Sequence, residues 1–502
     1  MRQPFLFMDL GHGWQNMTGH QGSATALASF SIDWGTSQPT SQPDPSVLSF
    51  KLIDRSGELA GNSTRLAGAK VLIQLTRMPQ WSDLTDPTDW QHQPEIMDWN
   101  GFHLAHRPDP TQPPDPTALT IFKGSMATGN SIEQSNQGIY KLSLHANGDL
   151  VRASRTTQQG PTSSDPALAG KHWTLSTKQR IDEVQQRLIS LGCPPLSETT
   201  VTWLNHAAGD LAPYELSSWP DLSTVLHSLA SASPDIPLFY ETHQHGIDQT
   251  EAWLAGAPSS ISLHSDGTLT AESGGRTQAV LAGDQIKVDA HTLTLPEPVS
   301  KVTVKGKKVK WDQSQGALIF EDAQIDFTDQ GRLPPNLKET IKSAIFESDA
   351  IIADESQGHW HGQVWRPTDA QRSQWAEWIK ACTIRLRPQK LTVTSAKADI
   401  DLAEQNLQPA PSLYAFISNR YTRLLSDDGT PATSGVWMAI GGTLSFTWAH
   451  DRPILSNEIN LWPMPTIPSQ ISRWQDLAPI ALAWNKLAIT WGEFSQITYF
   501  QR

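Results

Sequence analysis

Residues 31–53 read SIDWGTSQPTSQPDPSVLSFKLI, and this stretch holds the pattern that decides the fold. Apolar residues alternate with small or polar ones up to Trp34, and the alternation resumes from Leu48 to Leu52. A period of two indicates half-buried β-strands. Between the two strands lie Gly35 and a polar bridge with three prolines, which favours an extended crossing rather than a helix.

The same alternation recurs along the chain, at 71–75, 119–121 and 140–144, and strands predominate again from about residue 390. A proline-rich stretch from 79 to 118 reads as a long loop inserted between strands. The segment LSLHANGDL at 142–150 is echoed by ISLHSDGTL at 261–269, and both contain dipeptides suited to hairpin turns. SIDWG, at the start of the opening stretch, is likewise echoed by AITWG at 488–492.

Helical periodicity is confined to the middle of the chain. It predicts helices over 176–192, after Pro220, over 337–345 and over 368–382. The segment KVTVKGKKVKW at 301–311 reads as an exposed edge hairpin, with lysines on one face and apolar residues on the other. The sequence therefore predicts a β-rich, multidomain α+β protein.

Composition narrows the classes of function. The chain has 502 residues, and 51 acidic against 38 basic side chains give a net charge of −13. This balance argues against a protein that coats nucleic acid, which needs clustered Lys and Arg. Two cysteines, Cys193 and Cys382, favour a reducing compartment over a disulfide framework. Neither a secretory signal nor an apolar run long enough for a membrane anchor is recognised, so assembly in the cytoplasm is expected.

Residues suited to catalysis or cofactor binding form no recognised motif. His243 with His245, and His359 with His361, could each place two imidazoles on one strand face, but neither pair has a third ligand at a known spacing. Nucleophile elbows, Walker loops and dinucleotide fingerprints are missing from the sequence. The sequence thus predicts no catalytic residue, no metal and no cofactor, and we expect the protein not to be an enzyme.

The motifs around the opening stretch resemble those of a known family. A strand ending in Trp34-Gly35, a Gln-Pro-Asp-Pro bridge at 42–45 and a strand LSFKLID at 48–54 occur in the same order in minor tail proteins of long-tailed phages and prophages of Gram-positive bacteria. FKGSM at 122–126 and the helix at 176–192 continue this resemblance, which covers residues 25–195. The family belongs to the baseplate-hub or tail-tip type.

The resemblance implies a small N-terminal β-barrel with a defined set of motif residues. Trp34 would fill the end of the barrel, Gly35 would let the backbone turn or bulge, and the prolines would hold the crossing extended. The motif residues are Trp34, Gly35, Gln42, Pro43, Pro45, Phe50 and Asp54. The segments expected are an N-terminal arm at 1–24, the barrel with its inserted loop at 25–175, a mixed helical domain at 176–260, an α+β region at 261–390 and a C-terminal β-domain at 391–502.

In function, the resemblance implies a structural ring subunit of a virion tail tip. Such a subunit would form a trimer or hexamer, join the tail tube to host-recognition parts and line a channel through which DNA passes without specific binding. The implied partners are further copies of the chain, the tail tube, the distal tail and tape-measure proteins, and receptor-binding or fibre proteins. The choice between three and six copies, the hub or distal-tail role, and the host stay open.

Two other classes of function compete with this interpretation. Twenty tryptophans against six tyrosines is an unusual ratio, and Trp81, Trp90 and Trp99 in the long loop could stack on sugars of a host cell wall. The chain would then be a carbohydrate-binding module. A glycosidase or a metal-dependent hydrolase that uses the histidine pairs is the third class, and no motif supports it.

Overall fold

A computed structural model provides the structure of the chain. It describes residues 2–19, 23–77, 113–135, 137–157, 159–173, 176–207, 209–215, 217–244, 246–264, 269–279, 288–294, 299–328, 342–384, 387–394, 408–416, 435–449, 452–467 and 499–501. Strands dominate these residues and helices gather in the middle of the chain, which confirms the β-rich α+β class.

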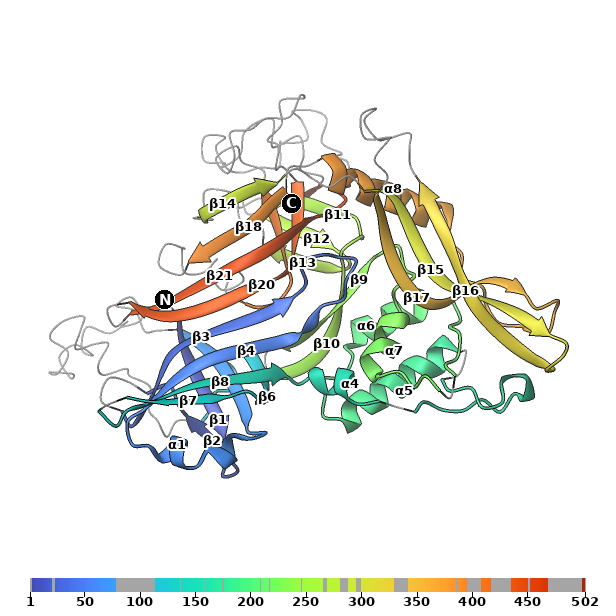
Figure 1. Cartoon of the computed structure of the whole chain (residues 1–502). Helices are drawn as coiled ribbons and strands as arrows, with labels where there is room; N and C mark the ends of the chain where they lie inside the picture. Colours follow the sequence, from blue (N-terminus) through green and yellow to red (C-terminus); the bar gives the residue numbers. More distant parts are fainter. Residues whose placement is uncertain are drawn as a thin grey trace.

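One large sheet of 13 strands contains strands from both halves of the chain (Figure 1). Its strands are β1 (Arg2–Asp9), β2 (Trp14–Asn16), β3 (Thr25–Gly35), β4 (Asp44–Asp54), β5 (Lys70–Arg77), β6 (Leu119–Met126), β7 (Ser131–Gln134), β8 (Tyr140–Gly148), β14 (Val288–Thr294), β18 (Arg387–Thr394), β19 (Ser412–Phe416), β20 (Gly435–Ala449) and β21 (Arg452–Pro463). They follow the order β14-β18-β21-β20-β3-β4-β8-β6-β5-β1-β2, with β19 beside β20 and β7 beside β8.

The expected closed N-terminal barrel is wrong for the part of the chain that the structure describes. The path of paired strands is open, from β14 at one end to β2 at the other. Closure does not occur because β3 pairs with β4 on one side and with the C-terminal strand β20 on the other. The N-terminal strands therefore form part of a larger sheet, and the division of the chain into five segments stays a prediction.

The N-terminal part of this sheet curls around its own apolar core. Alternate residues of its strands, such as Leu6, Phe50 and Leu144, point into this core and are almost fully buried. Phe30 of β3 stacks on Phe446 of β20, with ring centroids 5.2 Å apart, so the C-terminal strand contributes to the same core. Aromatic contacts of this kind add about 0.5–1.5 kcal/mol beyond the area that they bury.

Smaller elements lie between strands of the N-terminal part and in the middle of the chain. The helices are α1 (Glu58–Gly61), α4 (Val151–Arg155), α5 (Thr177–Ser190), α6 (Glu198–Ala207) and α7 (Leu222–Ser228), with 3-10 turns at Ser63–Leu66 and Pro166–Leu168. The hairpin of β9 (Pro237–Gln244) and β10 (Ile247–Leu254) lies between these helices and the large sheet (Figure 1). A four-stranded sheet is made of β11 (Ser259–His264), β12 (Leu269–Ser273), β13 (Arg276–Ala279) and β22 (Tyr499–Gln501).

A third sheet of three strands projects to the right in Figure 1. It contains β15 (Val299–Asp312), β16 (Ala317–Thr328) and β17 (Lys342–Glu355), and it is followed by α8 (Asp369–Ile384). The central strand β15 pairs antiparallel with β16 and parallel with β17. A second, larger core joins this sheet to the helices, and Trp173, Trp375, Trp378 and Trp437 lie fully buried in it.

Three of the four predicted helices are confirmed as α5, α7 and α8. The predicted helix over 337–345 is wrong for residues 342–345, the part that the structure describes, because the chain from Lys342 onward is strand β17. There Ala344 and Phe346 are buried while Ile345 and Glu347 face outward, which is a period of two. The parallel pairing with β15 has overridden the helical spacing.

The predicted edge hairpin at 301–311 is also wrong, since these residues run straight through the central strand β15. Gly306 lies within this strand, and its missing Cβ lets β17 approach closely, since a Cβ there would come within 2.6 Å of the Ala350 carbonyl oxygen. The two echoed segments, 142–150 and 261–269, also differ in structure. The segment at 261–269 runs from β11 into β12, whereas β8 is followed by helix α4.

Most of the long loop predicted at 79–118 and the AITWG echo at 488–492 lie outside the described residues. In the described part of the chain, no helix has both the length and the apolar character needed to cross a lipid bilayer.

Gly35 provides a test of how the two ends of the chain are joined. It has φ of +70°, and a Cβ at this position would lie 2.2 Å from the carbonyl oxygen of Ile440 in β20. We expect Gly35→Ala to lower the free energy of unfolding by more than about 2 kcal/mol in urea denaturation.

The matched control is Gly68→Ala. Gly68 has φ of +72° but nothing within 4 Å of an added Cβ. This variant therefore measures only the loss of stability from placing a side chain on a backbone with positive φ. Equal losses of stability in the two variants would show that the close approach to Ile440 does not matter.

Candidate functional site

The first motif residue, Trp34, lies near the C-terminal end of β3. Its side chain is buried in the second core and its ring is tilted against Tyr240 of β9, with centroids 6.3 Å apart. Gly35 follows with a shift in the pairing between β3 and β4. The Tyr240 hydroxyl donates to the carbonyl of Ile440, the same residue that Gly35 approaches. Trp34 therefore packs at a junction of three segments.

Gln42 connects the proline bridge to the hairpin β9–β10. Its side-chain amide donates to the Pro237 carbonyl at 2.8 Å and accepts from the Phe239 amide at 3.3 Å. By donating and accepting in this way, the Gln42 amide makes hydrogen bonds that the backbone of a neighbouring strand would otherwise make at the start of β9. Pro43 beside it is buried and Pro45, within β4, is partly buried.

The remaining motif residues stabilise the N-terminal sheet itself. Phe50 is buried in the N-terminal core. The Asp54 carboxylate, fully buried, accepts hydrogen bonds from the amides of Ser56, Gly57 and Ala60 and from the Ser56 hydroxyl. Asp54 thus shapes the turn after β4 and the start of α1. Trp81, Trp90 and Trp99, the predicted sugar contacts, lie outside the described residues.

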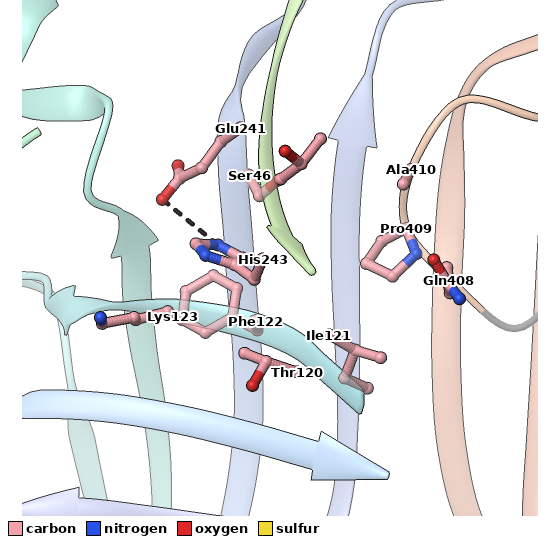
Figure 2. A pocket seen from close by; sticks show the side chains of 11 residues that line it. Ser46, Thr120, Ile121, Phe122, Lys123, Glu241, His243, Gln408, Pro409 and Ala410 are labelled. Atoms are coloured by element: carbon pink, nitrogen blue, oxygen red, sulfur yellow. Dashed lines mark ion pairs between the residues drawn. The ribbon is translucent and has the colours of Figure 1, made fainter. Parts of the chain in front are cut away.

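A cluster of charged side chains that the sequence did not reveal lies where β6 and β8 meet the central hairpin (Figure 2). His243 of β9 contacts Asp248 of β10 through Nδ1 at 2.7 Å and Glu241 through Nε2 at 3.4 Å. Lys123 of β6 pairs with the other oxygen of Asp248. Lys123, Glu241 and His243 line one side of a cavity of about 30 Å³, which has room for a single water molecule (Figure 2).

Glu241 extends this cluster to the end of β8. Its two carboxylate oxygens accept from the amides of Asp149 and Leu150 at 3.2 and 3.3 Å, immediately before helix α4. An added Cβ at Gly148 would come within 2.6 Å of the Glu241 carboxylate, so the glycine leaves room for this contact. A carboxylate at the first turn of a helix is favourable. This interaction satisfies two backbone amides at the start of the helix that follows β8.

The charges in this cluster compensate one another. Arg152 of α4 contacts Asp149 at 2.9 Å and the Ser125 hydroxyl of β6 at 2.9 Å. Burial, together with repulsion from Glu241, raises the pKa of Asp149. Burial alone would lower the pKa of His243, but the hydrogen bonds to Asp248 and Glu241 outweigh it and raise the pKa to about 9. Each cation has an anionic partner, so the cluster acts as a buried electrostatic clamp.

The other candidates for chemistry have structural surroundings. His359 stacks on Trp311 with ring centroids 4.0 Å apart, and His361 is exposed two residues later. In the ranges that the structure describes, no three His, Cys, Asp or Glu side chains are grouped as a metal site. Burial raises the pKa of the Cys193 thiol to about 11, which disfavours the reactive thiolate.

No family model and no curated protein matches the sequence. Among solved structures, the chain is similar to the tail protein from Neisseria meningitidis MC58, with 9% identity over 91% of this chain and 96% of that one, and a TM-score of 0.39. It is also similar to the E. coli c3393 protein, a component of the type VI secretion system that resembles bacteriophage T4 tail proteins, with 10% identity, coverage of 90% and 79%, and a TM-score of 0.33.

A third similarity is to the Francisella PdpA–VgrG complex in its half-lidded form. The identity is 10%, the coverage is 94% of this chain and 60% of that one, and the TM-score is 0.36. These neighbours are phage tail and type VI secretion proteins. At such identities and TM-scores, the similarity by itself transfers no function to this chain.

The clamp predicts a pH dependence of stability. Because the pKa of His243 is raised from 6.5 to about 9 on folding, its contribution is complete below pH 6.5 and is lost as the pH rises through 9. We expect the free energy of unfolding to fall by up to about 3 kcal/mol between pH 6.5 and 9.5.

The variant His243→Gln is the control for this titration, because it keeps polar contacts but has no proton to lose. Its unfolding free energy, measured by urea denaturation across the same pH range, should change much less. An equal fall in both proteins would mean that another group is responsible.

Proposed function

We propose that this chain is a structural ring subunit of a phage or prophage tail tip or baseplate. In this role it joins the tail tube to host-recognition parts and lines the channel through which DNA leaves. The proposal starts from the resemblance of residues 25–195 to minor tail proteins of long-tailed phages of Gram-positive bacteria. Its partners are further copies of itself, tail tube, distal tail and tape-measure proteins, and receptor-binding or fibre proteins.

The motif residues that carry the resemblance perform structural tasks. Gln42 connects the proline bridge to β9, Trp34 packs against Tyr240, and Gly35 allows β3 to approach β20. Each of these contacts joins parts of the chain that are about 200 or more residues apart. A rigid one-piece body is what a repeating building block of a ring requires.

The observation that carries the proposal is the outer face of the large sheet. A row of small polar side chains crosses five adjacent strands in register on the side away from the core. The row consists of Ser456, Ser445, Ser31, Ser49 and His145. The two rows that flank it are Glu458, Thr443, Asp33, Val47 and Asn147, and Ile454, Thr447, Ser29, Lys51 and Ser143.

The chemistry of this hydroxyl face suits a channel wall for DNA. Within the three rows, Lys51 carries the one permanent positive charge, whereas Asp33 and Glu458 carry negative charges. Binding to phosphates depends on clustered Lys and Arg, and base stacking depends on aromatic side chains. Eight of the fifteen side chains in the three rows are serine or threonine, and the charged ones are Lys51, Asp33 and Glu458, so the face offers a polyanion few groups that would hold it.

A first test measures assembly. Native mass spectrometry or light scattering of the purified chain should show a trimer or a hexamer, if necessary after addition of a tail-tube partner. A chain that stays monomeric at high concentration and with that partner would contradict the proposal.

A second test locates the hydroxyl face within the oligomer. In Ser31→Cys, a small maleimide should react in the assembled ring, while a maleimide attached to a large polymer should be excluded; both should react with the unassembled chain. The native Cys193 and Cys382 are buried, which keeps the background low. Gln186→Cys on the exposed side of α5 is the reference position. Equal reaction of both reagents at Ser31→Cys in the ring would place this face on the outside.

A further inference from the structure

A polar cleft lies between helix α7 and one face of the three-stranded sheet β16-β15-β17, and its smaller hollow is also lined by residues 39–42 of the proline bridge and by residues 236–237 at the start of β9. It consists of two adjoining hollows of about 690 and 480 Å³ that share His227, Ser231, Lys305 and Glu347. Each hollow is in the size range of small-molecule binding sites. The cleft is separate from the buried clamp and from the hydroxyl face of the large sheet.

The floor of the cleft is made of two open ion pairs. Lys305 contacts Glu347 of β17 at 2.6 Å, and Lys307 contacts Asp322 of β16 at 2.5 Å. The carboxylate side chains are 74% and 92% exposed, so they are available to a ligand. Because each ammonium group is held by a carboxylate, the two ion pairs offer hydrogen-bond donors and acceptors side by side and carry no net charge between them. A third carboxylate of the lining, Asp349, accepts hydrogen bonds from the hydroxyl groups of Tyr214 and Ser228.

The wall of the cleft adds uncharged groups from α7 and its C-terminal turn. Thr224, Ser228 and Ser231 contribute hydroxyl groups. Burial lowers the pKa of His227 to about 4, so its imidazole is neutral and has one donor and one acceptor. Among the described residues, no side chain or backbone group is hydrogen-bonded to the ring nitrogens of His227.

The composition of the cleft excludes several classes of ligand. An anion such as phosphate would have to displace the carboxylates that hold Lys305 and Lys307. A cation would have to displace these lysines from Glu347 and Asp322, or the hydroxyl groups of Tyr214 and Ser228 from Asp349. An apolar ligand would find one large exposed apolar side chain, Ile345, on the part of the lining that the structure describes. The matching ligand is neutral and rich in groups that both donate and accept hydrogen bonds.

A peptide strand fits this geometry less well than a sugar. Peptide strands add to the edge of a sheet through backbone groups. Here the floor is the face of the sheet, and Lys305 and Lys307 belong to its central strand, so side chains meet the ligand. Neighbouring hydroxyl groups of a sugar match an ammonium beside a carboxylate, and Ile345 offers an apolar contact to the C–H face of a ring.

We propose that this cleft binds a neutral oligosaccharide segment. The inference goes beyond the structural role and does not depend on it, since the cleft lies within one chain. It involves residues other than the tryptophans of the long loop, for which the sequence suggested contacts with sugars.

The test is calorimetric titration of the full-length chain with four neutral hexasaccharides: cellohexaose, maltohexaose, chitohexaose and laminarihexaose. At least one should bind with a Kd below about 1 mM. Glu347→Ala and Asp322→Ala should each weaken that binding at least tenfold, because each removes an acceptor from the floor. Both side chains are largely exposed, so the variants should keep the thermal stability of the wild type.

The matched control is Glu355→Ala. Glu355 also pairs with lysines of β15, namely Lys308 and Lys310, but it does not line the cleft. Its variant should bind the sugar like the wild type. Absence of binding by all four sugars, or equal weakening in the control, would overturn the inference. So would equal or tighter binding of inorganic phosphate or of an uncharged Ser-Val hexapeptide. These titrations do not depend on assembly. A monomer that binds sugar would therefore contradict the proposed ring subunit but not the proposed sugar-binding cleft.

Discussion

The structure depends on a close approach of backbones where β3, β20 and β21 lie side by side in the large sheet. An added Cβ at Gly35 would lie 2.2 Å from the Ile440 carbonyl, and one at Gly441 would lie 2.4 Å from the Thr36 carbonyl. At Gly442 the same atom would lie 2.1 Å from the carbonyl of Glu458. Three glycines therefore allow strands from the two ends of the chain to form one sheet. Trp34 of the second core and Tyr240 of the hairpin β9–β10 pack beside this contact, and the Tyr240 hydroxyl donates to the Ile440 carbonyl.

Local patterns predicted the fold where the burial of one face decides it. The alternation up to Trp34 and from Leu48 gave β3 and β4 correctly, and the amphipathic stretch after residue 176 gave α5. The spacing of apolar residues within a strand does not indicate which other strand pairs with it. The predicted barrel was wrong because the partner of β3 is β20, about 400 residues later, and nothing in the N-terminal motifs specifies that choice.

The candidate site was less predictable, because its residues come together only in the fold. Gln42 was singled out as part of a motif, but its contacts with Pro237 and Phe239 could not be read from the spacing. The clamp around His243 joins β6, β8, β9 and β10, and a histidine pair was its only trace in the sequence. The lysines of 301–311 were expected on an exposed edge hairpin, but they lie on the central strand β15 and pair with carboxylates of β16 and β17, which the sequence spacing does not show.

These features together describe a molecule whose charges and motif residues mainly hold its parts together, with a hydroxyl face and a polar cleft left open to solvent. Electron cryo-microscopy of the purified assembly tests the central claim most directly. The account predicts a ring whose central opening is lined by β20, β3 and β4 of every copy, with Ser445, Ser31 and Ser49 facing the channel. A ring in which these strands lie on the outer surface, or are buried between copies, would contradict it.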